Sequence, residues 1–187
     1  MNVLAFDFET TGLTVHPSAP LDRQPRPIEF GGVLVDHLGR ELDTIEVLID
    51  PGVDIEPKIT EITGITNEML REQGVPFDEA AAQILPLFRD ADVMVAHNLP
   101  FDETILRLAL KRAGIADWPW PRGICTAQEY RAVNGKRPRL IHLHEQVMGR
   151  KLEQTHRALD DVRALVAILL KEQTIERLHA ATTPRPD

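Results

Sequence analysis

The segment VLAFDFETTGL, residues 3–13, decides the fold, because it is an apolar stretch interrupted by two carboxylates. It is typical of a β-strand, in which successive side chains point to opposite faces of the sheet. One face then carries Phe6 and Phe8, whereas Asp7 and Glu9 share the other. Carboxylates two residues apart lie roughly 6.6 Å apart along a strand, near enough to bind one divalent cation. A strand that ends in a solvent-exposed polar turn gives the same pattern, so the segment alone leaves both interpretations open.

The composition is typical of a globular domain. The chain has 187 residues, of which 43% are hydrophobic and 27% are charged. This size suits one domain with a substantial core. We therefore expect a single domain over residues 1–175 and a partly disordered C-terminal end over residues 176–187.

Cysteine usage and hydropathy bear on the compartment. Cys125 is the single cysteine of the sequence, which excludes an internal disulfide and a thiolate metal cage within one chain and favours a reducing compartment. The N-terminal segment does not have the pattern of a signal peptide, and the apolar run at residues 164–170 is too short to cross a bilayer. We expect a cytoplasmic protein that does not bind membranes.

The formal charge of the chain is -8 at pH 7. This charge weighs mildly against non-specific binding of nucleic acid, because polyanions bind where Lys and Arg neutralise their phosphates. Acids clustered around two divalent ions would reverse the charge locally. The net charge therefore does not exclude a nucleic-acid partner.

Periodicity and turn residues predict the other elements of the fold. The proline-rich segment 14–27 is expected to form a loop at the rim of a cleft. The predicted strands cover residues 28–35, 41–49 and 93–96. The predicted helices cover residues 59–66 (a short turn), 77–88, 102–113, 126–132 (a helical turn), 140–148 and 157–173. Strands followed by helices that alternate with a strand predict an α/β fold with a mixed sheet.

Two predicted helices place an acid near the core. Asp102 points close to the centre of the apolar stripe of its helix, although it also suits an N-terminal capping role. In the last long helix Asp161 lies at the edge of the buried stripe, whereas Asp160 points to the opposite side. His156 precedes that helix. A lone histidine is more often a surface residue, but beside an acid cluster it becomes a candidate base.

Four motifs stand in order along the chain: DFETTGL at 7–13, ITGIT at 62–66, AHNLPFD at 96–102 and HRALDD at 156–161. Together they resemble those of the DEDDh (proofreading-type, DnaQ-like) superfamily of 3′-to-5′ exonucleases. The resemblance runs from residue 3 to about residue 170. The family pattern places its histidine five positions before its last acid, which selects Asp161 rather than Asp160. The proline-rich loop is longer than the family pattern.

The resemblance implies an RNase H-like fold with a mixed five-stranded sheet flanked by helices. It also implies a metal-dependent hydrolase that uses two Mg²⁺ ions, for which Mn²⁺ can substitute, roughly 3.5 to 4 Å apart. Asp7, Glu9 and Asp161 would hold one ion, and Asp7 and Asp102 the other. His156 would accept the proton of the attacking water. The products would be nucleoside 5′-monophosphates.

The resemblance further implies contacts to a 3′ end. These are the backbone of Thr10 and Thr11 at the terminal hydroxyl, Leu13 against the last base, Asn98 near the phosphate and Phe101 stacked on a base. Each has a structural alternative, namely a tight turn, a core leucine, a strand-end hydrogen bond and a core aromatic. The basic stretch over residues 131–139 suits guidance of the strand, and a solvated basic loop is its alternative.

Three functions are consistent with these motifs. The first is hydrolysis of single-stranded DNA in replication or repair, with a DNA polymerase as a possible partner. The second is trimming of RNA, because the acids and the histidine do not distinguish the two sugars. The third is a non-catalytic nucleic-acid-binding module, against which the complete set of five site residues argues. The oligomeric state and the pathway stay open.

Overall fold

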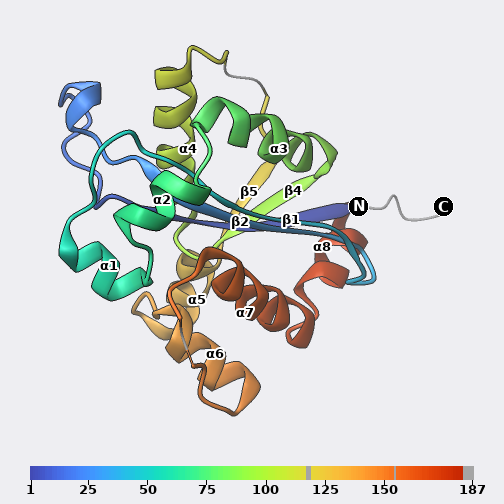
Figure 1. Ribbon diagram of the computed structural model, residues 1–187. Coiled ribbons are helices and arrows are strands. Elements are labelled where there is room, and N and C mark those ends of the chain that lie inside the picture. The colour runs from blue at the N-terminus through green and yellow to red at the C-terminus, as the bar shows by residue number, and fades with distance from the viewer. Residues whose placement is uncertain (117–118, 154, 183–187) are drawn as a thin grey trace.

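The computed structural model describes residues 1–116, 119–153 and 155–182. Its centre is a five-stranded mixed sheet in the order β3-β2-β1-β4-β5 (Figure 1). The strands are β1 (Asn2–Thr10), β2 (Pro27–Asp36), β3 (Glu41–Leu48), β4 (Val93–Ala96) and β5 (Arg122–Cys125). β1, β2 and β3 are antiparallel, whereas β4 is parallel to both β1 and β5. The acidic strand β1 therefore lies at the middle of the sheet.

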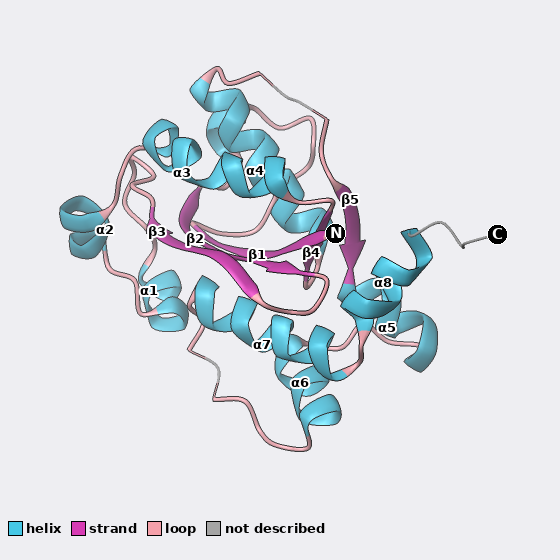
Figure 2. Ribbon diagram, turned by 90° about the vertical axis from the view of Figure 1, so that its right-hand side faces the viewer, coloured by secondary structure: helices cyan, strands magenta, loops and turns pink. Residues whose placement is uncertain are grey.

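Helices cover both faces of this sheet (Figures 1 and 2). They are α1 (Pro57–Thr63), α2 (Asn67–Gln73), α3 (Phe77–Asp90), α4 (Leu99–Ala113), α5 (Thr126–Asn134), α6 (Leu140–Met148), α7 (Ala158–Lys171) and α8 (Thr174–Thr182). Side chains of α3 and α4 pack on one face, and those of α6, α7 and α8 pack on the other. The mixed five-stranded sheet flanked by helices, expected from the sequence, is confirmed.

The face beneath α3 and α4 is rich in phenylalanine. Phe6 and Phe8 of β1 point to it together with Phe30 of β2, and Phe88 of α3 covers them. The ring centroids of Phe6 and Phe88 lie 4.9 Å apart in an edge-to-face arrangement. Such aromatic pairs add about 0.5–1.5 kcal/mol beyond the area that they bury. Apolar contacts therefore close this face along β1 from Leu4 to Phe8.

The opposite face of the same strands packs against α7. Val3 and Ala5 of β1 and Val33 and Val35 of β2 form a second core with the apolar stripe of that helix. The alternation of side chains in β1 dictates that residues 7 and 9 point to this second face. The apolar pattern of the second face therefore gives way to acids at one end of β1.

The sequence analysis missed one strand and two helices, namely β5, α2 and α8. β5 has only four residues and follows two prolines, so its strand conformation depends on the ladder that it forms with β4. α2 begins at Asn67, where the side chain of Thr66 accepts a hydrogen bond from Met69 N at 3.1 Å.

Helix α4 was predicted, but it begins at Leu99, three residues before the predicted start. Pro100 is favourable in the first turn of a helix, which explains the earlier start.

The proline-rich segment 14–27 is a loop with one short 3₁₀ turn, Leu21–Arg23. The guanidinium of Arg112 in α4 donates to the carbonyl oxygens of Leu21, Gln24 and Pro25 at 2.6, 2.7 and 2.9 Å. These bonds fix the loop against the helix that carries Asp102.

The C-terminal segment contains α8, whose Ile175 is buried in the core of the α7 face. Of the end that was expected to be partly disordered, residues 183–187 lie outside the described residues. Within the described part of the chain, every helix falls short of the length and hydrophobicity that a bilayer crossing needs.

Candidate active site

The acids of β1 lie directly under the first turn of α7. In the β1–β2 ladder Asp7 is opposite Gly31, and Glu9 is opposite Glu29. A β-carbon on Gly31 would overlap backbone atoms of the first residues of α7. The absence of a side chain at Gly31 therefore allows the helix to approach the sheet beside Asp7.

Helix α7 brings two further polar groups to these acids. One ligand atom from each of Glu9, His156 and Asp161 lies within 4.8 Å of the others. Asp161 occupies the first turn of α7 and is 9% exposed. His156 precedes the helix in a left-handed conformation, with φ of 52°. Carboxylate oxygens with one imidazole nitrogen suit a divalent cation such as Mg²⁺, Mn²⁺ or Zn²⁺.

Asp102 approaches β1 from the other side, in the first turn of α4. It is 2% exposed, and its Oδ1 accepts a hydrogen bond from the backbone N–H of Phe8 at 3.1 Å. The N-cap residue of α4 is Asn98, so Asp102 stands inside the helix and not at the cap. The bond to Phe8 fixes this carboxylate against the strand residue between Asp7 and Glu9.

Burial and mutual repulsion raise the pKa values of these carboxyls. Burial, followed by the charges of Asp161 and Glu29, raises the pKa of Asp7 to about 7. Burial and the charge of Asp7 raise the pKa of Glu9 to about 9. Burial and Asp7 also raise the pKa of Asp102 well above its usual value. A cation would relieve this repulsion, so the residues present fit a divalent metal site.

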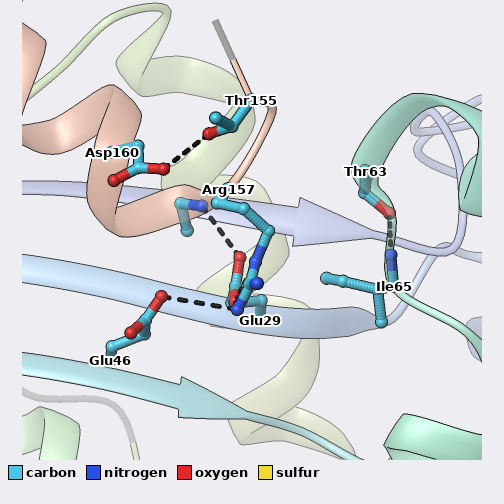
Figure 3. A network of polar contacts seen from close by, with 8 residues as sticks. Glu29, Glu46, Thr63, Ile65, Thr155, Arg157 and Asp160 are labelled. Carbon is cyan, nitrogen blue, oxygen red and sulfur yellow. Dashed lines mark hydrogen bonds and ion pairs between the residues drawn. The ribbon is translucent and has the colours of Figure 1, made fainter.

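The neighbouring acid of α7 lies outside the cluster. Asp160 is exposed, and its Oδ2 accepts a hydrogen bond from the hydroxyl of Thr155 at 2.6 Å (Figure 3). Asp161 points to the acids of β1 instead. The helical periodicity predicted this difference between the two adjacent residues.

A cleft of about 820 Å³ opens beside the acids. Its lining includes Asp7, Asp161 and His156 and, from the segment between α5 and α6, Arg137 and Arg139. The arginines therefore belong to the same hollow as the acids. Both side chains are exposed, so guidance of a strand and a solvated basic loop both stay predictions for them.

His97 fixes this basic segment in place. Its Nε2 lies 2.9 Å from the carbonyl oxygen of Pro138, and its Nδ1 lies 2.9 Å from the hydroxyl of Thr126. A carbonyl oxygen accepts only, so Nε2 carries a proton. Burial lowers the pKa of His97, which favours the neutral ring, and in that form Nδ1 accepts from the Thr126 hydroxyl. The neutral ring thus links the end of β4, the start of α5 and the basic segment.

The five residues expected to contact a 3′ end differ in their surroundings. Thr10 is buried, and its hydroxyl donates to Gly12 O at 2.7 Å, whereas the Thr11 hydroxyl accepts from Arg26 N at 3.0 Å. Leu13 is 82% exposed, which excludes the core alternative. The other two are Asn98, exposed in the lining of the cleft, and Phe101, half-buried at the edge of the phenylalanine-rich core. Their contacts to substrate stay predictions.

Sequence reasoning missed one polar pair beside the cluster. Glu29 is fully buried in β2 and is bound by Arg157, the residue that follows His156. The available signal was the alternation in PIEFGGVLVD, residues 27–36, which puts Glu29 on the face of Val33 and Val35.

Comparison with known proteins gives a consistent result. The family model RNase T, described as exonuclease, matches residues 4–169. A PolC-type DNA polymerase III of Thermotoga maritima is 33% identical over 168 residues, which are 90% of this chain and 12% of that protein. A PolC-type DNA polymerase III of Clostridium perfringens is 32% identical over 169 residues, 89% of this chain and 11% of that protein. The chain thus spans about an eighth of these relatives.

Two solved structures show the same fold. Exonuclease I of E. coli in complex with a dA16 oligonucleotide has a TM-score of 0.75 at 22% identity, covering 95% of this chain and 42% of that one. The nuclease domain of 3′hExo, a DEDDh family member bound to rAMP, has a TM-score of 0.71 at 16% identity, covering 100% and 96%.

Proposed function

The chain belongs to the RNase T family of exonucleases, and on this premise we propose that it hydrolyses single-stranded DNA from the 3′ end to nucleoside 5′-monophosphates. The observation that supports the proposal most directly is the convergence of Glu9, His156 and Asp161 within 4.8 Å, at a cleft lined by Asp7. These groups come from β1 and from the start of α7, which lie far apart in the sequence.

We assign two divalent cations to the acids. Asp7, Glu9 and Asp161 would hold one, and Asp7 and Asp102 would hold the other. Mg²⁺ is the expected ion, with Mn²⁺ as a substitute. When bound, such ions neutralise charge on the scissile phosphate and lower the pKa of water. The residues with raised pKa values, Asp7 and Glu9, would bind the ions in their deprotonated forms.

His156 is the proposed general base, because its ring lies beside the acid cluster at the start of α7. A neutral imidazole nitrogen can accept the proton of the attacking water. We expect His156→Ala to lose turnover and to keep most of its affinity for Mn²⁺, because three carboxylates still offer oxygen ligands. Isothermal calorimetry with Mn²⁺ and the rate of strand shortening measure the two properties separately. Abolished Mn²⁺ binding would assign His156 to the metal and not to the water.

The cleft offers groups for the strand. Arg137 and Arg139 line the same cleft as the acids and would bind phosphates, which would let a chain with net charge -8 hold a polyanion. We expect Asn98 to contact the phosphate. The backbone of Thr10 and Thr11 would bind the terminal hydroxyl. Leu13 and Phe101 would contact bases, and the 82% exposure of Leu13 leaves its side chain available.

A polymerase partner is part of the proposal, because the segments that this chain matches belong to PolC-type DNA polymerases III. The chain would then remove nucleotides from the 3′ end that a polymerase extends. We expect it to work in the cytoplasm.

The experiment is to incubate 5′-labelled single-stranded DNA and RNA of one sequence with the protein and Mg²⁺. Asp7→Ala is the inactive control, and Asp160→Asn is a matched control that removes an exposed acid from the same helix. We expect stepwise shortening of DNA by the wild type and by Asp160→Asn. Faster shortening of RNA would make the chain an exoribonuclease. A wild type that shortens neither polymer, or an Asp7→Ala protein as active as the wild type, would defeat the proposal.

A further inference from the structure

The proposed mechanism leaves one charged residue beside the site without a role. Glu29 is 0% exposed in β2, and its neighbour in the β1–β2 ladder is Glu9. Its charge adds to the repulsion that raises the pKa values of Asp7 and Glu9. A buried carboxylate among other acids needs a cation or hydrogen-bond donors to compensate its charge.

That contact is to the start of α7. Oε1 of Glu29 accepts hydrogen bonds from Nε of Arg157, at 2.8 Å, and from its Nη2 (Figure 3). Oε2 accepts the backbone N–H of Ala158 at 2.8 Å. Arg157 is the N-cap residue of α7, and Ala158 is the first helical residue. One carboxylate from β2 therefore takes both the guanidinium and a helix N–H that the helix itself leaves unbonded.

The guanidinium of Arg157 also reaches β3. Its Nη2 lies 3.4 Å from Oε1 of Glu46, and its side chain is 31% exposed. Charge-assisted bonds of this kind are roughly twice as strong as neutral ones, and the planar guanidinium fixes direction as well as distance. The start of α7 is thus held to two neighbouring strands.

Arg157 is linked directly to two residues of the proposed site, His156 and Asp161. His156 directly precedes it, and Asp161 N donates to its carbonyl oxygen at 3.1 Å. A displacement of residue 157 would therefore move both the proposed base and an acid of the cluster. The strand acid Glu9 would stay in place, because it belongs to β1.

We propose that Glu29 is a positioning residue that acts through Arg157 and Ala158 to set where His156 and Asp161 stand relative to Glu9. The inference rests on the proposed function, since it concerns the same site. Glu29 orients the segment that carries these two residues and is not among the described residues that line the cleft.

The test uses two substitutions and their combination. Glu29→Gln keeps the shape and the acceptor for Ala158 but removes the charge that pairs with Arg157. Arg157→Gln removes the other partner from a position that is partly exposed, and it reports on the same link if Glu29→Gln does not fold. Glu41→Gln is the matched control, because Glu41 forms an exposed ion pair with Arg163 of the same helix at 3.3 Å.

Each variant is measured by Mn²⁺ titration, by kcat and KM on the labelled strand, and by its melting temperature. We expect each single substitution to weaken Mn²⁺ binding about tenfold and to lower kcat roughly 10- to 100-fold, as is usual for groups that orient metal ligands. KM should stay within about twofold, because the strand-binding groups are untouched. The double variant should be no worse than the poorer single, since residues that act through one contact are not additive.

Two results would overturn the inference. One is a lower melting temperature in Glu29→Gln with Mn²⁺ affinity and kcat equal to those of Glu41→Gln, which is what a purely structural role gives. The other is a double variant whose losses multiply. If the wild type shortens no polymer, the proposed function fails, and the Mn²⁺ titrations of the same four proteins still decide this inference.

Discussion

The two faces of β1 show how one strand can serve both stability and chemistry. On the α3 and α4 side, Phe6 and Phe8 continue the apolar pattern that Leu4 begins. On the α7 side, the pattern changes from Ala5 to Asp7 and Glu9. The first face is packed by aromatic contacts, whereas the second holds carboxyls whose pKa values are raised by burial and by one another.

The acids therefore stand on the α7 face at positions of β1 where apolar residues would extend the core of that face. The phenylalanine-rich face stabilises the strand enough to hold acids that repel one another on its reverse side. Substitutions on the first face should therefore change stability. Substitutions on the second face should change the response to metal and to pH.

The largest effect is expected on the apolar face. Phe6→Ala should lower the free energy of unfolding by about 3–5 kcal/mol, because it removes a fully buried ring and leaves a cavity. Urea denaturation measures the change. Leu42→Ala, at a residue that is 52% exposed, is the control and should change stability by less than about 0.5 kcal/mol. A small effect of Phe6→Ala would mean that this face does not dominate stability.

On the acidic face, we expect stability to depend on pH. The folded protein without metal keeps protons on Asp7 and Glu9, whose pKa values are about 7 and 9, where the unfolded chain has released them. Raising the pH from 5 to 9 therefore favours the unfolded state, and stability should fall steadily over this range. Urea denaturation in a chelating buffer measures this fall.

Two comparisons sharpen that prediction. Asp7→Asn should flatten the pH profile, because it removes one titrating group and the repulsion that acts on Glu9. Saturating Mn²⁺ should also flatten it, since a cation stabilises the deprotonated carboxylates. If the stability of the metal-free wild type does not change with pH, the pKa values of these carboxyls are not raised in the folded protein.

The smallest effect separates the two faces at adjacent residues of β2. Gly31→Ala should cost about 2 kcal/mol, because the added carbon meets the backbone of α7, and should weaken Mn²⁺ binding about tenfold. In Gly32→Ala the added carbon would lie 2.7 Å from the ring of Phe30, on the other face. It should lower stability and leave Mn²⁺ affinity unchanged. Equal Mn²⁺ affinities in the two variants would contradict the comparison.

Periodicity predicted those parts of the site that depend on a single element. The strand period placed Asp7 and Glu9 on one face, and the helix period separated Asp161 from Asp160. Helix α6 was predicted with the bounds that the structure gives it. These features are local, because backbone geometry alone relates neighbouring side chains.

The rest depends on contacts that the sequence pattern does not contain. β5 is a strand because β4 offers it a ladder, and Glu29 is buried because Arg157, 128 residues later, covers it. The place of Arg137 and Arg139 in the cleft depends on the bond from His97 to Pro138. A hydrogen-bond partner so far along the chain gives no local signal.

The position of α7 over β1 has a consequence for how the molecule is made. The cluster joins Glu9 to His156 and Asp161, so the chain must be synthesised past residue 161 before the cluster can close. Pairings of such long sequence separation form slowly, because the loop entropy must be overcome first. The cluster therefore forms only after the segment that carries His156 and Asp161 has docked on β1.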